Sequence, residues 1–122
     1  AALRAASVML DEIKSHVRNG NDFAFETTLI GLTYARMIPQ WRRAGYGVKL
    51  IYLSLANPEI AISRVAARVR QGGDAVSVEV IRRRFSSGRR KFDEIYKSLA
   101  DVWILYDNSE TNPRLIDEGE FR

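Results

Sequence analysis

Glu26 is a carboxylate inside an otherwise apolar run at residues 23–28, whose composition indicates a short buried strand. A carboxylate is costly to take out of water unless a partner compensates its charge. In open α/β sheets, ligands bind beyond the carboxyl ends of the strands, so Glu26, Thr27 and Thr28 are candidates for a polar binding site. A neighbouring arginine or backbone amide would satisfy the carboxylate equally well, and position alone does not separate the two interpretations.

A second group of residues that could do chemistry is the run of arginines between residues 64 and 90. Only two acids, Asp74 and Glu79, lie within this segment. Such a local excess of positive charge attracts anions. The arginines are Arg64, Arg68, Arg70, Arg82, Arg83, Arg84, Arg89 and Arg90.

The arginines fall on two helical segments joined by a Gly-Gly turn, which indicates a lid that closes over phosphates. Phosphoryl transfer needs such a lid, because charge develops on the transferred group and water must be excluded. The spacing predicts that Arg64 and Arg68 face solvent, that Arg70 lies at the edge of the apolar stripe, and that Arg83 points away from its helix's apolar face. A solvated basic surface is the competing interpretation. Nucleic-acid binding is a third, which the scarcity of interleaved aromatic residues disfavours.

The elements that must position these residues alternate between helical and strand-like patterns. Apolar residues at three- and four-residue spacing predict helices over residues 1–18, 31–44, 58–70, 77–85 and 89–99. Nearly continuous apolar runs predict strands over residues 23–28, 48–55 and 102–106, with a short edge strand near 114–116. This alternation indicates an α/β fold with a parallel sheet flanked by helices, in a single domain over residues 1–122. Three or four strands are few for such a sheet, so we expect the sheet to be incomplete at its N-terminus.

Composition excludes several function classes. The 122 residues are 46% hydrophobic and 28% charged, which is ordinary for a chain that buries a core, and the net charge is +4. There is no cysteine and a single histidine, His16, which excludes disulfides and disfavours zinc sites and a histidine-centred triad. No apolar run reaches the length of a membrane helix and no signal-peptide pattern opens the chain, so we expect a cytoplasmic protein without a membrane partner.

Taken together, these segments resemble the zeta-toxin-like group of P-loop kinases over nearly the whole chain. The resemblance rests on residues 23–29, on Ala44-Gly45-Tyr46 before the 48–55 strand, on Pro58-Glu59 at the start of a helix that ends in Arg68-Val69-Arg70-Gln71-Gly72-Gly73, on residues 80–85 and on residues 103–109. It implies a P-loop NTPase-like fold and an ATP-dependent phosphotransferase that uses Mg²⁺ and acts on a small-molecule acceptor. A UDP-activated amino sugar is one candidate acceptor, and an antitoxin protein is a candidate partner.

The resemblance also implies roles for particular residues. Glu26 matches the acid that contacts the phosphate acceptor, with Thr27 and Thr28 lining the same pocket. Arg70 and Arg83 match the lid arginines that hold the nucleotide phosphates and stabilise the transferred charge. Their neighbour in the sequence, Arg82, is a further candidate for nucleotide binding.

Two functional parts of the family have no counterpart in this sequence. The Walker A loop ends in Gly-Lys-Ser/Thr, yet no glycine here is followed by lysine. The aspartate that serves the family as general base lies upstream of the segment that matches Ala1. Asp74 stands where many relatives carry a histidine after the paired glycines. We therefore expect the C-terminal part of such a kinase, inactive without an upstream P-loop. The alternative is a non-catalytic remnant that binds an anion or a protein.

Overall fold

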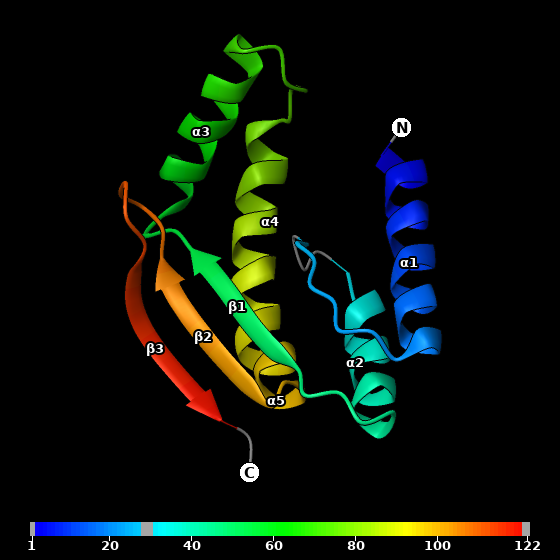
Figure 1. The fold of residues 1–122 in the computed structure, drawn as a ribbon. Helices are drawn as coiled ribbons and strands as arrows, with labels where there is room; N and C mark the ends of the chain where they lie inside the picture. The colour runs from blue at the N-terminus through cyan, green and yellow to red at the C-terminus, as the bar shows by residue number, and fades with distance from the viewer. Residues whose placement is uncertain (1, 28–30, 121–122) are drawn as a thin grey trace.

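The computed structural model describes residues 2–27 and 31–120, without the side chains of residues 2–6. Residues 28–30, between α1 and α2, are outside the described residues, and Thr28 is one of them. Figure 1 shows the arrangement of the elements. In chain order they are α1 (Ala2–Asn19), α2 (Thr33–Arg43), β1 (Lys49–Ser54), α3 (Pro58–Arg70), α4 (Val78–Lys91), the π-helical turn η1 (Phe92–Tyr96), α5 (Lys97–Leu99), β2 (Val102–Asp107) and β3 (Arg114–Glu120).

The strands of the described chain form one mixed sheet in the order β1-β2-β3. β1 and β2 are parallel, with Lys49 opposite Val102 and Ser54 opposite Asp107. Parallel neighbours need a long crossover, which α3 and α4 supply. β3 runs antiparallel to β2, so the sheet is mixed, and the predicted parallel pairing holds for β1 and β2. The short turn between β2 and β3 leaves the chain no room for the crossover that parallel pairing requires.

The predicted strand at residues 23–28 does not form in its described part. Residues 21–27 follow a course without strand pairing, and β1 is an edge strand among the described residues. The two phenylalanines of this run pack on α2 instead. The ring centroids of Phe23 and Phe25 lie 5.4 and 6.0 Å from that of Trp41. Tertiary packing of the aromatic rings therefore accounts for the apolar pattern without a strand partner.

The helices predicted at residues 77–85 and 89–99 are one continuous helical run. α4 passes through a buried Gly88, continues into η1 without a break, and ends with α5. In η1 the side chains of Phe92 and Tyr96 are both fully buried. Phe92 packs on the sheet, and Tyr96 packs with core residues of α1 and α2. The π-helical turn sets the spacing between these two side chains, and a regular α-helix would turn Tyr96 to a different direction. α2 contains Pro39 and continues through it.

The core lies on one face of the sheet. Phe92 stacks on Tyr52 of β1 at 4.6 Å between ring centroids and meets Trp103 of β2 edge-on at 5.9 Å. The other face remains open in the described chain, because Ile51 and Leu53 are 53% and 54% exposed. Figure 1 shows α4 crossing behind β1, with α1 and α2 to the side. No helix among the described residues combines the length and apolar character that crossing a bilayer requires.

Gly119 of β3 allows Trp103 to lie across the neighbouring strand. A Cβ at this position would fall 2.6 Å from Cε2 of the indole, which is rigid and cannot move aside without shifting the core. We expect Gly119→Ala to destabilise the protein by about 1–3 kcal/mol, as overpacking does. Urea unfolding followed by tryptophan fluorescence measures the loss. Gly47→Ala is the matched control, because its Cβ would meet nothing within 4 Å. Equal unfolding midpoints for the two variants would contradict the packing argument.

Candidate functional site

The carboxyl ends of β1 and β2 are joined by hydrogen bonds, at the edge where α/β sheets bind ligands. Ser54 Oγ donates to the carbonyl of Tyr106 at 2.9 Å, and the amide of Asn108 donates to the carbonyl of Ser54 at 2.8 Å. The amide of Ala56 donates to Ser109 Oγ at 2.8 Å. These bonds fix the chain that leaves each strand, so any ligand at this edge meets a rigid platform.

The turn after β2, at residues 107–109, is closed by its own side chains. Asp107 Oδ1 accepts hydrogen bonds from the hydroxyl and the amide of Ser109. Those two hydrogen bonds, helped by Arg114, hold the pKa of Asp107 below its usual value. The Asp107 carboxylate therefore serves to close the turn.

The side chain of Arg64, in α3, donates hydrogen bonds to this turn. Its Nη2 donates to the carbonyls of Asn108 at 2.6 Å and Ser109 at 3.1 Å. The prediction that Arg64 faces solvent is wrong, because the side chain is half-buried over the turn, whereas Arg68 is exposed as predicted. A helical wheel could not reveal this contact, because its partners lie 44 and 45 residues along the chain.

A groove of about 490 Å³ lies beside the Arg64 contact. Its lining is mostly apolar, with two arginines and one amide side chain. The lining residues are Leu53, Leu55, Ala61, Arg64, Val65, Ala67, Arg68 and Asn108. The groove thus combines the open sheet face with the side of α3 at the carboxyl edge of the sheet.

The two basic helices begin where the sequence predicts. Asn57 Oδ1 accepts from the amide of Ile60 at 3.1 Å and caps α3, and Ser77 Oγ accepts from the amide of Val80 at 3.3 Å and caps α4. Such caps satisfy amides that have no partner within the helix. The helices are also joined by an ion pair between Arg82 and Glu59 at 2.8 Å. The hydrogen bond from Arg82 lowers the pKa of Glu59.

The predicted site residues lie on exposed parts of three elements. Arg70 is exposed at the last residue of α3, and Arg83 is exposed in the second turn of α4. Glu26 and Thr27 are exposed in the connection between α1 and α2. None of these four residues lines the groove beside Arg64 or the cavity at the amino ends of β1 and β2. Their convergence on one ligand therefore stays a prediction.

The connection that carries Glu26 is anchored to the helical run that follows α4. Tyr96 Oη of η1 donates to the carbonyl of Gly31 at 2.9 Å. Its pKa is raised, because the hydroxyl is removed from water by burial. Tyr34, at the start of α2, packs its ring 4.9 Å from that of Phe25. The residues on either side of 28–30 are thus held by aromatic contacts and one hydrogen bond.

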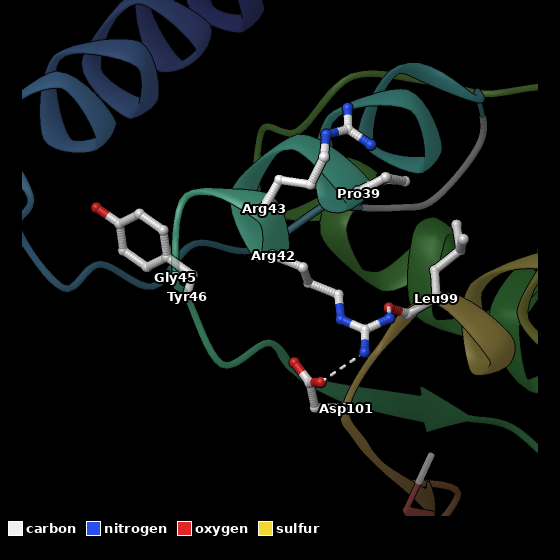
Figure 2. A pocket seen from close by; sticks show the side chains of 7 residues that line it. All are labelled: Pro39, Arg42, Arg43, Gly45, Tyr46, Leu99 and Asp101. Atoms are coloured by element: carbon white, nitrogen blue, oxygen red, sulfur yellow. Dashed lines mark hydrogen bonds and ion pairs between the residues drawn. The ribbon is translucent and has the colours of Figure 1, made fainter. Parts of the chain in front are cut away.

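A second cavity, of about 440 Å³, lies at the amino ends of β1 and β2, the edge opposite the expected ligand site. Figure 2 shows Arg42 extended across it toward Asp101, with an ion pair of 2.9 Å. Arg42 also donates to the carbonyl of Leu99, and Asp101 accepts from the amide of Val48. Arg43 and Tyr46 point away from this contact (Figure 2). The ion pair fastens α2 to the strand ends, and we assign it a structural role.

The mixed sheet, with two arginine-rich helices crossing over from the carboxyl end of β1, defines an α/β protein. The family model described as Zeta toxin matches residues 3–119, and the chain belongs to this family. It is 27% identical over 85 residues to an uncharacterised protein from Haemophilus influenzae, an alignment that covers 70% of this chain and 58% of the relative. The chain therefore spans less than two thirds of that relative. No solved structure matches the chain.

Proposed function

We propose that this chain is part of an ATP-dependent phosphotransferase of the zeta-toxin type that acts on a small molecule. The observation that carries the proposal is the family match across residues 3–119. The exposed arginines of α3 and α4 support it, because they give the end of the molecule beyond the strands a strong positive charge. Two helices joined by a turn that contains Gly72, which has a positive φ of 97°, suit a lid that bends over phosphates.

In this proposal Arg70 and Arg83 hold the nucleotide phosphates and stabilise the charge that develops on the transferred group. Arg82 assists them. One of its nitrogens pairs with Glu59, and its other N–H groups remain suited to a phosphate. Glu26, Thr27 and Thr28 contact the acceptor, for which a UDP-activated amino sugar is the first candidate. ATP is the phosphate donor, and Mg²⁺ bound through residues outside this chain neutralises part of its charge. An antitoxin protein is the proposed partner in the cell, and the cytoplasm the proposed location.

The phosphate-binding loop is proposed to come from residues outside these 122. Among the described residues, β1 has a free edge and residues 21–27 run without a strand partner. Both features support the addition of a further strand beside β1, which would complete a P-loop NTPase-like sheet and lead into a Gly-Lys-Ser/Thr loop. Residues 64–90 would then act as the lid of a single α/β domain.

We expect the 122 residues by themselves to show no ATP turnover above a buffer blank. The amides and lysine of a P-loop are needed to hold the β- and γ-phosphates, and this chain has no Gly-Lys pair. The full-length protein, with its upstream coding sequence, is expected to transfer phosphate to an amino-sugar nucleotide in the presence of Mg²⁺. Phosphorus NMR of the reaction mixture detects the transfer. Robust ATPase activity of the 122-residue chain would contradict the truncation argument.

The absence of a Gly-Lys pair in this chain also favours one alternative, a non-catalytic remnant that binds an anion or a protein through its basic helices. The same experiment separates the two. A remnant retains nucleotide or polyanion binding in the full-length protein but forms no phosphorylated product with any acceptor.

A further inference from the structure

The direction of α3 depends on contacts that leave the helix partly open to solvent. None of its 13 residues is fully buried, although Ile62 and Val65 are half-buried, and α3 packs chiefly on α4. Figure 1 shows α3 leaving the carboxyl end of β1 and projecting, with the first half of α4, beyond the end of the sheet. Arg70 stands at the far end of this projection. A small rotation of α3 about its base therefore displaces Arg70 more than any other residue of the helix.

Among the residues that the structure describes, two polar contacts oppose such a rotation. The first is the ion pair between Glu59 and Arg82, whose side chains are 62% and 50% exposed. Exposed ion pairs of this kind contribute little, because water screens them and two flexible side chains must be ordered. It joins α3 to α4, which continues into η1 and is attached to the sheet there through Phe92. This contact therefore restrains α3 only through the neighbouring helix.

The second contact joins α3 to the sheet itself. Arg64 donates from Nη2 to the carbonyls of Asn108 and Ser109, and the side chain is half-buried. The turn that receives these bonds is in turn fixed to the end of β1. The amide of Asn108 donates to the carbonyl of Ser54, and Ser109 Oγ accepts from the amide of Ala56. Hydrogen bonds from a charged donor are stronger than neutral ones, so Arg64 is the main polar tether of α3.

We propose that Arg64 is a positioning residue for phosphoryl transfer, acting through Arg70. This inference rests on the proposed function. Arg64 fixes the middle of α3 to the turn after β2, and Arg70 lies six residues further, about 9 Å along the helix axis. With the tether in place, the Arg70 guanidinium is held where the transferred phosphoryl group will be. Without it, α3 keeps only its packing on α4 and the Glu59–Arg82 ion pair, and Arg70 is placed less precisely.

The first experiment is Arg64→Gln in the full-length protein. We expect kcat to fall about tenfold to a hundredfold, because small misplacements of a stabilising group have effects of this size. The acceptor KM should change less than about twofold, since the acceptor does not bind through α3. Arg64→Lys keeps a charged donor on a long side chain and should restore part of the rate. Arg18→Gln, at an exposed position of α1 outside the lid, is the matched control and should leave kcat unchanged.

A double-mutant cycle separates positioning from general destabilisation. When Arg70 is already alanine there is nothing left to position, so adding Arg64→Gln should lower kcat less than about twofold further. A purely structural role would instead lower kcat by the same factor in both backgrounds, and that additive result would overturn the proposal. Thermal unfolding of each variant confirms that the comparison is between folded proteins. If Arg64→Gln does not fold, Arg64→Lys completes the cycle.

Failure of the proposed function has a different signature. If the wild-type full-length protein forms no phosphorylated product, or if Arg70→Ala leaves kcat unchanged, the phosphotransferase or its lid is wrong, and the positioning role falls with it. If Arg70→Ala is impaired while Arg64→Gln is either silent or additive, the phosphotransferase stands and only the role of Arg64 is refuted.

Discussion

Replacing Arg70 or Arg83 with alanine is expected to lower kcat of the full-length protein by about 100- to 1,000-fold, the effect of removing one group that stabilises transition-state charge. KM for ATP and for the acceptor should change far less, because the interaction strengthens only as charge moves onto the transferred group. Both arginines are exposed on the projecting ends of α3 and α4, so truncating them removes no core packing.

Steady-state kinetics of phosphate transfer provide the measurement, with ATP and the acceptor varied separately. Arg84→Ala is the matched control, because Arg84 follows Arg83 on α4 and is also exposed. It removes the same charge from the same helix and should retain most of the activity. A variant of Arg70 or Arg83 with wild-type kcat would refute the lid assignment. A loss shared equally by Arg84→Ala would indicate a general effect of charge in place of specific phosphate contacts.

Phe92→Ala is expected to lower the free energy of unfolding by about 3–5 kcal/mol, the range for removing a large buried aromatic side chain. The Phe92 side chain is fully buried in η1, and it joins the helical run to both parallel strands through Tyr52 and Trp103. Lys97 Nζ lies 5.6 Å from the centre of the same ring, so the substitution also removes a cation–π contact. The cavity left between helix and sheet cannot close, because rigid rings line it.

Chemical unfolding monitored by circular dichroism tests this expectation. Val78→Ala is the control, because Val78 is 47% exposed at the start of α4 and its truncation opens no cavity. Phe92→Leu should fall between the two and remains measurable if the alanine variant has no folded population. A loss for Phe92→Ala as small as that for Val78→Ala would show that η1 contributes little to the attachment of helix to sheet.

The sequence predicted the elements that have local signals. Asn57-Pro58 and Ser77 act as helix starts because a cap needs only its own side chain and an amide three residues on. β1 and β2 were predicted from apolar runs, and both form. The family was also identified correctly from the order of these segments, and its model matches residues 3–119.

Prediction from the sequence failed where the local structure depends on contacts with residues far away in the chain. The run at residues 23–28 has a strand-like composition, but whether it pairs depends on a neighbour, and its rings pack on Trp41 instead. β3 was expected as three residues and extends to seven, because pairing with β2 orders polar residues that have little strand propensity. Arg64 was predicted to face solvent for the same reason, since its acceptors belong to a turn far along the chain. The roles of Glu26, Thr27, Arg70, Arg82 and Arg83 remain predictions.

In the part of the chain that the structure describes, β1 has no strand beside one of its edges, which affects how these 122 residues would behave in solution. That strand carries the exposed side chains of Ile51 and Leu53. An unprotected apolar edge is a template for pairing with another chain, and natural proteins usually guard such edges with charge or a covering segment. Concentrated preparations of this segment should therefore aggregate through β1. Ile51→Lys would place a charge on this strand and oppose that association.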